Sequence, residues 1–450
     1  MIRVLPMTVA AAMAIAARGV ARHADGQRAR SLAAAATAGL IGLLLLLDWL
    51  VVAAGLPASF ELAGIECELE RAGWQRTMPF VDLVIALLAI GLAPVASHPP
   101  RTLATILLTI AIAIAFQSLD EPITMSLLWG ASVLLVAREL LRLEGRASAV
   151  VRAFRRYQGV SVAAIIVGAI AFASGNPTFG AVMWLLAIAL REAILPLHGW
   201  LPLFASRAPL GLLVALVAPQ PGVYAQLTVC GDITGGALAH DFAIFAALTG
   251  IAAAALGVVQ TDARRAACWL IISQTGLIAF GLENASLVGR TGAVLSWQVM
   301  ALGTSGFVMT IAALEARRGT LSLREPGGSF ARTPRMAVAF LLLGFASVAL
   351  PGTLGFVAED LLVQGSVDEY PLVGFAVVIA TALNGINVMR SFFVLFSGTT
   401  RHTGEHDLTR LEAGVLSVVL AVLLVGGALP RSLLSPEHPP TSPSTPPSDH

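Results

Sequence analysis

Lysine is absent from this 450-residue sequence, so all 28 of its basic side chains are arginines. Charge of either sign is scarce, because Asp, Glu, Lys and Arg together make up only 12% of the residues. Arginine keeps its proton in proteins, whereas a buried lysine can release one. A proton that moves through the interior of this protein must therefore be carried by a carboxyl or an imidazole group.

Cysteine is nearly absent as well. Cys67, Cys230 and Cys268 lie far apart without the spacing of metal ligands, so we expect neither a disulfide framework nor an iron–sulfur or zinc site. The net charge of +1 gives no indication of nucleic-acid binding. No nucleotide-binding loop, haem motif, catalytic triad or quinone signature is recognisable. We expect no cofactor, no metal ion and no catalytic site in this chain.

Hydrophobic residues dominate what is present. They form 57% of the chain, and the mean hydropathy is +0.82, which is typical of an integral membrane protein. The pattern predicts an all-α polytopic membrane protein with about fourteen transmembrane helices, several of them short. The apolar runs lie near residues 4–17, 31–55, 79–96, 102–117, 122–138, 158–174, 178–195, 209–229, 241–259, 266–282, 291–314, 335–350, 371–396 and 412–428. The first run could instead be a cleaved signal peptide, since Arg3 precedes an alanine-rich stretch.

No soluble domain interrupts these runs. Residues 1–430 are predicted to form one transmembrane domain, with a short helix near residues 66–74 in the longest outer connection. Residues 431–450 are rich in proline and serine and cannot bury a core, which predicts a disordered tail.

Arginine and acidic residues fall on alternating connections. The first, fifth and eleventh connections are rich in arginine, whereas the second, fourth and twelfth are acidic. The arginines are Arg18, Arg22, Arg28, Arg30, Arg138, Arg142, Arg146, Arg152, Arg155, Arg156, Arg317, Arg318, Arg324, Arg332 and Arg335, and the acidic residues are Glu61, Glu66, Glu68, Glu70, Asp120, Glu121, Asp368 and Glu369. By the positive-inside rule the odd-numbered connections are cytoplasmic, which places both termini outside the inner (plasma) membrane.

The stretch from residue 187 to 224 differs from an ordinary membrane span. It carries Arg191 and Glu192 within an apolar run, followed by prolines at 196, 202, 209, 219 and 221. A charge at the centre of a bilayer is costly in free energy, and proline interrupts a helix. We therefore expect the helix that begins near residue 178 to break just after the charged pair, with its freed backbone groups buried in protein or lining a wet cavity.

Three motifs within residues 120–400 resemble a known family. The first is PLHGWLP at 196–202, followed by AP at 208–209 and GVY at 222–224. The second is QTDARR at 260–265 with ISQTG at 272–276, and the third is LPGTLGF at 350–356. They are similar, in the same order, to motifs of the antiporter-like L-, M- and N-type membrane subunits of respiratory complex I. Related subunits occur in membrane-bound hydrogenases, Mrp multisubunit sodium/proton antiporters and energy-coupled inorganic-carbon transporters.

The resemblance implies an inverted internal repeat of five helices, with one proline-broken helix in each half, at Pro196 and Pro351. It also implies a proton path at mid-membrane depth and assembly with other membrane subunits. The family's path uses a Glu in the fifth helix, a Lys in the seventh, a Lys or His in the eighth, and a Lys or Glu near the twelfth.

Several of the implied positions are altered in this chain. Counting back from the histidine of the first motif places Arg191 where the family has the seventh-helix Lys. The fifth-helix Glu falls on Gly130, and a nine-residue shift would place Glu139 there instead. The eighth-helix Lys falls on Gln220, and the nearby His position on Val214.

Glu192 and His198 are the first candidates for proton transfer. Glu192 could titrate under the influence of Arg191, or the two could form a buried structural ion pair or bond to neighbouring helices. His198 matches a family histidine and could relay protons, or it could bond a carbonyl freed near the break. Asp48 and Asp82, in early helices, are expected to contact a partner subunit or to lie near an interface.

The second break supplies further candidates. Glu359 and Asp360 follow the Gly-Phe of the third motif, and they could line the proton path or lie in a solvated loop at its outer mouth. Asn384, Asn387 and Arg390 are spaced three residues apart in the predicted thirteenth helix, so they lie roughly on one face. This spacing indicates either a wet path or bonds between helices.

Three functions stay open at this point. The chain could be a proton-translocating membrane subunit of a respiratory or hydrogenase-type complex, such as an NADH:quinone oxidoreductase-like complex. It could be the membrane half of an inorganic-carbon or cation/proton transporter, with Na⁺ or bicarbonate linked to the proton. It could also be a non-conducting scaffold, because it lacks groups that the resemblance implies. In each case the expected surroundings are the lipid bilayer and other membrane subunits, with no nucleic acid.

Overall fold

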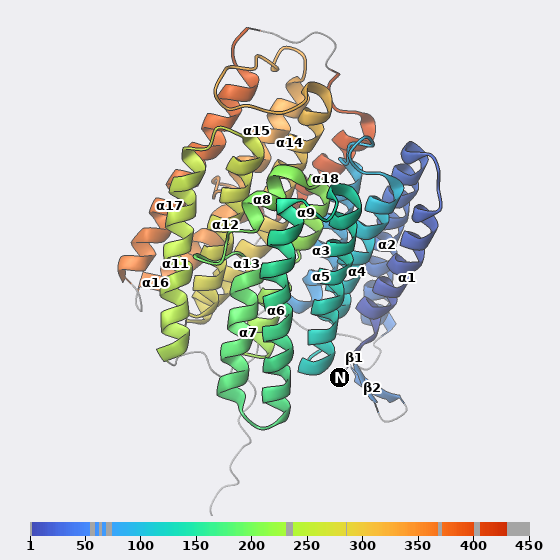
Figure 1. Ribbon diagram of the computed structural model, residues 1–450, viewed down its shortest axis with the longest axis vertical. Helices are drawn as coiled ribbons and strands as arrows, with labels where there is room; N and C mark the ends of the chain where they lie inside the picture. Colours follow the sequence, from blue (N-terminus) through green and yellow to red (C-terminus); the bar gives the residue numbers. More distant parts are fainter. Residues whose placement is uncertain are drawn as a thin grey trace, which may run out of the picture.

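The computed structural model describes residues 2–54, 59–62, 65–68, 74–230, 237–284, 286–367, 371–399 and 406–429. In these ranges the chain is a bundle of long helices that run roughly side by side, with the N-terminus at one end of the bundle (Figure 1). The expected all-α membrane fold is confirmed. The tail predicted at 431–450 lies outside the described residues.

The helices follow one another along the chain in two groups. The first group is α1 (Val4–Ala21), α2 (Gly26–Ala54), α3 (Trp74–Gly91), α4 (Pro100–Phe116), α5 (Pro122–Glu144), α6 (Ala149–Ala173), α7 (Pro177–Arg191), α8 (Leu201–Arg207), α9 (Leu210–Val217) and α10 (Pro221–Thr228). The second group is α11 (Ala237–Val258), α12 (Ala263–Leu282), α13 (Leu287–Val299), the π-helix η2 (Met300–Thr304), α14 (Ser305–Arg318), α15 (Pro334–Ala346), α16 (Leu354–Val367), α17 (Pro371–Phe396) and α18 (Arg410–Ala428).

Three short strands form a small sheet beside the N-terminus. They are β1 (Ile2–Arg3), β2 (Ser59–Leu62) and β3 (Ile65–Glu68), in the order β1-β3-β2, with β1 parallel and β2 antiparallel to β3. The short helix predicted near residues 66–74 is therefore wrong, because its first residues pair with neighbouring strands and α3 begins only at Trp74.

Eleven helical segments in the described ranges are long and apolar enough to cross a membrane. Three further apolar helices, α4, α7 and α15, are shorter. Two of these three, α7 and α15, end at the expected breaks, which explains their length. The total of fourteen spans stays a prediction.

The centre of the bundle is α12. Every residue from Ala266 to Leu282 is buried, whereas α2, α6, α11 and α17 each expose large apolar side chains. Gly276 lets α12 approach α11 closely, because a Cβ at this position would lie 2.7 Å from the carbonyl oxygen of Ala246. An apolar outer surface suits contact with lipid, and the polar residues of α12 are kept away from that surface.

Both predicted helix breaks are present, and their backbones have the same geometry. α7 ends at Arg191 and α15 ends at Ala346. Shortly after each end, Ala193 and Ala349 both adopt a φ of 59°. This left-handed conformation normally requires glycine, because a Cβ crowds the following carbonyl oxygen. The same uncommon solution at both breaks agrees with the expected internal repeat.

Each break is closed by the same hydrogen bond. The N–H of Ile194 donates to Ala189 O at 2.9 Å, and the N–H of Leu350 donates to Phe345 O at 3.0 Å. Both bonds reach back five residues, which is the Schellman way of ending a helix. The bond satisfies one freed carbonyl and leaves others for side chains.

A third interruption separates α9 from α10, where the sequence predicted one continuous run at 209–229. Gln220 has a φ of 37°, and the helix on each side has only eight residues. Pro219 and Pro221 flank this residue, and neither has an N–H to continue the helical bonds. The hydropathy of the run concealed the break. Nearby, η2 supplies a wider helical turn of a kind that is frequent at functional sites.

The two acidic residues of the early helices have different environments. Asp48 forms a partly exposed ion pair with Arg76, with 2.6 Å between Oδ2 and Nη2. Asp82 is completely buried in the middle of α3. The expectation that Asp82 contacts a partner subunit or lies at an interface is therefore wrong.

Ala193→Gly tests the strained backbone at the first break. Alanine in a left-handed conformation costs roughly 1–2 kcal/mol, and glycine avoids this. The matched control is Ala187→Gly, because Ala187 is equally buried but lies inside α7, where glycine costs roughly 0.5–1 kcal/mol. We expect a higher midpoint of thermal unfolding in detergent for Ala193→Gly than for Ala187→Gly. Equal midpoints, or the reverse order, would contradict the strained geometry.

Candidate functional site

Arg191 stands at the C-terminal end of α7 and points toward α5. Its Nη1 donates a hydrogen bond to Ser132 Oγ at 3.0 Å, and its guanidinium carbon lies 4.6 Å from the centroid of the Trp129 ring. These two residues flank Gly130, where the resemblance implies a glutamate. The cation is therefore held by a hydroxyl and an aromatic face instead of a carboxylate, and the negative end of the helix dipole favours it further.

Glu192 faces a different element, α10. It is buried, and its Oε1 accepts no hydrogen bond from any described residue. A Cβ on Gly222 would lie only 2.0 Å from this oxygen, so the carboxyl group rests against the first turn of α10. The described residues contain no ion pair between Glu192 and Arg191, so the buried structural ion pair considered from the sequence is wrong. The positive end of the α10 dipole, typically worth about 0.3–1 kcal/mol to an anion, stands near the carboxyl instead.

A small cavity lies beside Arg191, between α4, α5 and the α9–α10 break. Its volume is about 10 Å³, close to the space that one water molecule needs. Thr109, Ser132 and Arg191 supply polar groups to its lining, and Pro219 and Pro221 belong to its wall. The first and third interruptions therefore meet at a site that suits a single water.

Three consecutive residues of α12, Ser273, Gln274 and Thr275, connect the interruption at Gln220 with the one after α15; we call them the α12 polar segment. Thr275 Oγ1 accepts a hydrogen bond from Gln220 Nε2 at 3.0 Å. Gln274 Nε2 donates to Ser347 O at 2.6 Å, a carbonyl freed at the end of α15. Because successive helical residues point about 100° apart, adjacent side chains reach different breaks.

The remaining contacts of the α12 polar segment reach η2 and α17. Thr304 of η2 donates to Gln274 Oε1 at 2.5 Å. Asn384 of α17 donates to Ser273 Oγ at 2.8 Å. Around the second break, the central helix is thus bonded through side chains to the end of α15, to η2 and to α17.

A second cavity lies at the α15–α16 break. Its volume is about 40 Å³, room for about two or three water molecules. Its polar lining consists of Gln274, Ser296, Ser347, Glu359, Thr381 and Asn384. Glu359 therefore belongs to α16 and lines this cavity, and the interpretation that places it in a solvated loop is wrong. Its neighbour Asp360 is exposed.

Three other candidates have structural roles instead. Glu139 forms an ion pair with Arg142, with 2.5 Å between Oε1 and Nη2. It lies two helical turns along α5 from Ser132, which contacts Arg191, so Glu139 does not take the fifth-helix position. Asn387 donates to Ala266 O at 3.0 Å. Arg390 donates to the carbonyl of Gln260 at 2.8 Å, at the end of α11. These bonds tie α17 to its neighbours, so of the predicted polar face only Asn384 reaches the cavity.

His198 lies in the connection between α7 and α8 and is half-buried. Its ring packs against Trp269 of α12, with 5.3 Å between the centroids. The described residues show no hydrogen bond from His198 to Glu192. Its role as a proton relay stays a prediction.

Glu283, which was not a candidate from the sequence, lies at the end of α12. Gln226 donates a hydrogen bond to it from α10. Burial raises the pKa of the Glu283 carboxyl to about 7, and the hydrogen bond from Gln226 opposes this rise. Gln226 follows Gly222 by four residues, so one face of α10 contacts both Glu192 and Glu283.

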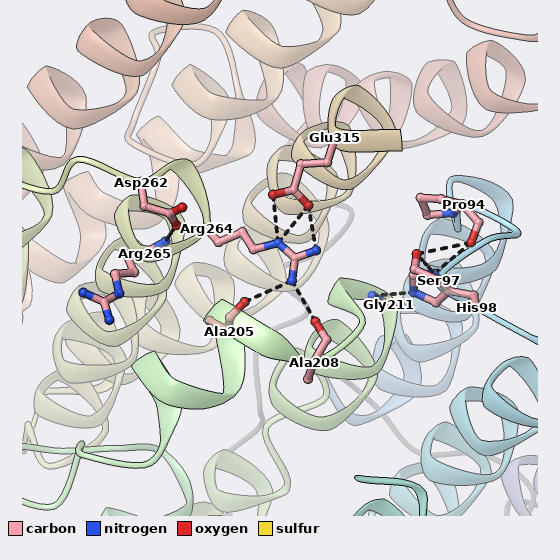
Figure 2. A network of polar contacts seen from close by, with 10 residues as sticks. All are labelled: Pro94, Ser97, His98, Ala205, Ala208, Gly211, Asp262, Arg264, Arg265 and Glu315. Atoms are coloured by element: carbon pink, nitrogen blue, oxygen red, sulfur yellow. Dashed lines mark hydrogen bonds and ion pairs between the residues drawn. The ribbon is translucent and has the colours of Figure 1, made fainter. Parts of the chain in front are cut away.

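The second motif forms a polar network at the other end of α12 (Figure 2). Arg264 pairs with Glu315 of α14 at 2.7 Å and donates to Ala208 O at 3.0 Å. His98 Nε2 accepts the N–H of Gly211 at 3.1 Å, and burial lowers the pKa of His98 to about 4, which keeps the ring neutral for this role. The network fixes the connection between α8 and α9, and so the helices that carry the first and third breaks.

The α12 polar segment was visible in the sequence only as part of the ISQTG motif. Serine, glutamine and threonine do not titrate near neutral pH, so a search for ionisable groups passes over them. The available signal was three polar residues in succession within an otherwise apolar span, at a depth where lipid offers no partner.

A comparison with known families now decides the relationship. The family model described as NADH:quinone oxidoreductase/Mrp antiporter, TM, matches residues 124–384, more than half of the chain. The chain belongs to this family. The matched region contains all three interruptions and the α12 polar segment, and the resemblance drawn from the three motifs is confirmed.

Individual relatives agree with this assignment. NADH-quinone oxidoreductase subunit M of Mycobacterium tuberculosis (strain CDC 1551 / Oshkosh) is 27% identical over 258 residues, covering 56% of this chain and 47% of the relative. The chain spans about half the length of the curated relatives it matches.

Two solved structures have the same fold. A chain of respiratory complex I from Thermus thermophilus with bound NADH has a TM-score of 0.82 at 19% identity, covering 95% of this chain and 96% of that one. A chain of the Mrp complex from Dietzia sp. DQ12-45-1b has a TM-score of 0.77 at 16% identity, covering 96% of both chains. At these identities the likeness establishes the fold alone.

Arg264→Ala tests the structural role of the second motif. The substitution leaves Glu315 largely buried without its counter-ion, so we expect the free energy of unfolding to fall by about 3 kcal/mol. Arg265→Ala is the matched control, because this neighbouring side chain is exposed. Thermal unfolding in detergent measures both variants. An equal, small loss in the two would show that Arg264 does not hold the α8–α9 connection.

Glu283→Gln tests the buried carboxyl at the end of α12. A carboxyl whose pKa is higher in the folded protein binds more protons there than in the unfolded chain, so stability falls as pH rises from about 4.5 to about 7. Glutamine keeps an oxygen that accepts from Gln226 but cannot ionise. We expect the fall in unfolding temperature across this pH range to be smaller in the variant than in the wild type. An identical fall would contradict the raised pKa.

Proposed function

We propose that this chain is a proton-translocating membrane subunit of a larger energy-coupling complex, and that Glu192 and Glu359 bind and release the transported proton. One observation carries the proposal: the buried carboxyl group of Glu192 lies at an interrupted helix without an ion-pair partner among the described residues. A carboxyl locked to a cation is held ionised, whereas one that faces a helix end can exist in both protonation states at modest cost. Such a group suits reversible protonation.

Arg191 has a supporting role in this proposal. It cannot release its proton, so it remains a fixed positive charge while Glu192 changes its own. Its contacts with Ser132 and Trp129 direct it toward α5, whereas the carboxyl of Glu192 faces α10. The fixed charge can therefore bias the protonation of Glu192 without neutralising it through a direct contact.

The route between the two acids follows the α12 polar segment. Gln220 stands between the two prolines that line the first cavity and bonds Thr275, and the neighbouring Gln274 lines the cavity that Glu359 also lines. Amides and hydroxyls do not carry the proton themselves, but they order water molecules that can pass it on. The two cavities have room for such waters at either end.

The proposed setting is the inner (plasma) membrane, with other membrane subunits of the complex as partners. The arginine-rich connections, including the one between α14 and α15, are placed on the cytoplasmic side. Both termini then lie outside, and the N-terminus is indeed at the opposite end of the bundle from the α14–α15 connection (Figure 1).

A cation/proton transporter is the second candidate. Buried oxygens without partners among the described residues, on Glu192 and Gln220, are the kind of ligands that Na⁺ binds. Replacing Na⁺ by choline in the flux assay separates the candidates, because a proton-only path is insensitive to this change. An inorganic-carbon transporter would respond to added bicarbonate in the same assay, and a non-conducting scaffold would show no flux in either.

Glu192→Gln is the direct test of the proposal. In liposomes that contain the chain with its co-purified partner subunits, we expect this variant to abolish proton flux, because an amide cannot bind and release a proton. Gly222→Ala should also reduce flux strongly, since its methyl group would lie 2.0 Å from the carboxyl oxygen and displace the Glu192 side chain. The matched control is Gly385→Ala in α17, where an added Cβ meets no atom within 4 Å.

The outcomes separate the proposal from the scaffold alternative. Flux lost in Glu192→Gln and Gly222→Ala but kept in Gly385→Ala supports conduction through this chain. Unchanged flux in Glu192→Gln would contradict the proposal and favour a scaffold that keeps the fold.

A further inference from the structure

Asp82 is a buried carboxyl group that the proposed path does not use. It lies in the middle of α3, at the centre of a membrane span, and its exposed fraction is 0%. Both of its carboxyl oxygens lack hydrogen-bond partners among the described residues. A carboxylate without a cation or a donor is very unfavourable in a dry interior, so a group in this position is expected to hold a proton.

The surroundings of Asp82 contain no compensating charge among the described residues. α3 packs mainly against α2, α4, α9, α14, α18 and η2, and it also contacts Tyr224 of α10 and Gln298 of α13. None of their described charged side chains acts on the carboxyl, and the polar group beside it is Gln117. In this part of the chain, then, Asp82 is neither part of an ion pair nor a cap for a helix.

Gln117 connects Asp82 with the break between α9 and α10. Its Nε2 donates to Pro219 O at 3.1 Å, a carbonyl freed by the interruption. Its Oε1 has no partner among the described residues. Because Gln117 is also the polar side chain beside Asp82, it stands between this carboxyl group and the break. Pro219 in turn belongs to the wall of the small cavity that Arg191 lines.

We infer that Asp82 is a proton-binding residue that exchanges its proton with water in the small cavity beside Arg191, with Gln117 ordering the water between them. This inference rests on the proposed function. It assigns to α3 the acidic group that α5 lacks at Gly130. The step is a proton transfer only: the O–H bond of the Asp82 carboxylic acid breaks as an O–H bond forms on a water molecule ordered by Gln117, and that water passes a proton to a water in the small cavity beside Arg191.

Proton flux with Asp82→Asn tests the inference in liposomes that contain the chain and its co-purified partners. We expect flux to fall about a hundredfold, which is the lower end of what a positioned proton-transfer group typically contributes to a rate. Asp48→Asn is the matched control, because Asp48 is a partly exposed, ion-paired aspartate of the neighbouring helix. Its flux should equal that of the wild type.

Infrared spectroscopy of the same complex in nanodiscs distinguishes a proton-binding role of Asp82 from a purely structural role. We expect the wild type to show a carbonyl stretch of a protonated carboxylic acid that is missing from Asp82→Asn and that weakens in alkaline buffer. Gln117→Leu should keep this band and still lower flux, because it removes the connection. That variant also decides the question if Asp82→Asn does not assemble.

Each outcome has a distinct meaning. Wild-type flux in Asp82→Asn, or a band that does not respond to pH, would overturn the role of Asp82. Wild-type flux in Asp82→Asn together with lost flux in Glu192→Gln leaves the proposed function intact. Wild-type flux in both variants defeats the proposed function as well.

Discussion

Polar groups at the centre of a membrane must find their partners inside the protein, because lipid offers none. In this chain the demand arises at three helix interruptions, after Arg191, at Gln220 and after Ala346. The α12 polar segment supplies hydrogen-bond partners for several of these groups, because it bonds to Gln220, to a freed carbonyl of α15 and to Asn384 of α17. The buried position of α12, the cavities and the candidate proton carriers all follow from this one arrangement.

The absence of lysine changes how charge is managed in such a site. Arg191 contacts a hydroxyl group and an indole ring at the end of α7, and Glu192 contacts the first turn of α10. Each charged group therefore lies at a helix end instead of pairing with the group of opposite charge. A carboxyl in this position can change its protonation state without breaking an ion pair. The family's fold is thus compatible with proton transfer that depends on carboxyl groups and water alone.

The sequence predicted the two breaks at Pro196 and Pro351, because proline acts on the backbone locally and independently of context. It did not predict the interruption at Gln220, since hydropathy over an apolar run carries no information about backbone hydrogen bonds. The environments of Asp82 and Glu359 were also misjudged. The position of a residue within an apolar run indicates its depth in the membrane. Which neighbouring helix covers a given face of that run depends on tertiary packing, which the sequence does not show.

Ordered water is the most direct evidence for or against a hydrated seam between the breaks. A high-resolution cryo-electron microscopy map of the complex in lipid measures it. We expect water density in the cavity lined by Gln274 and Glu359 and in the small cavity beside Arg191. Two empty cavities, with apolar side chains closing the space between them, would contradict the account.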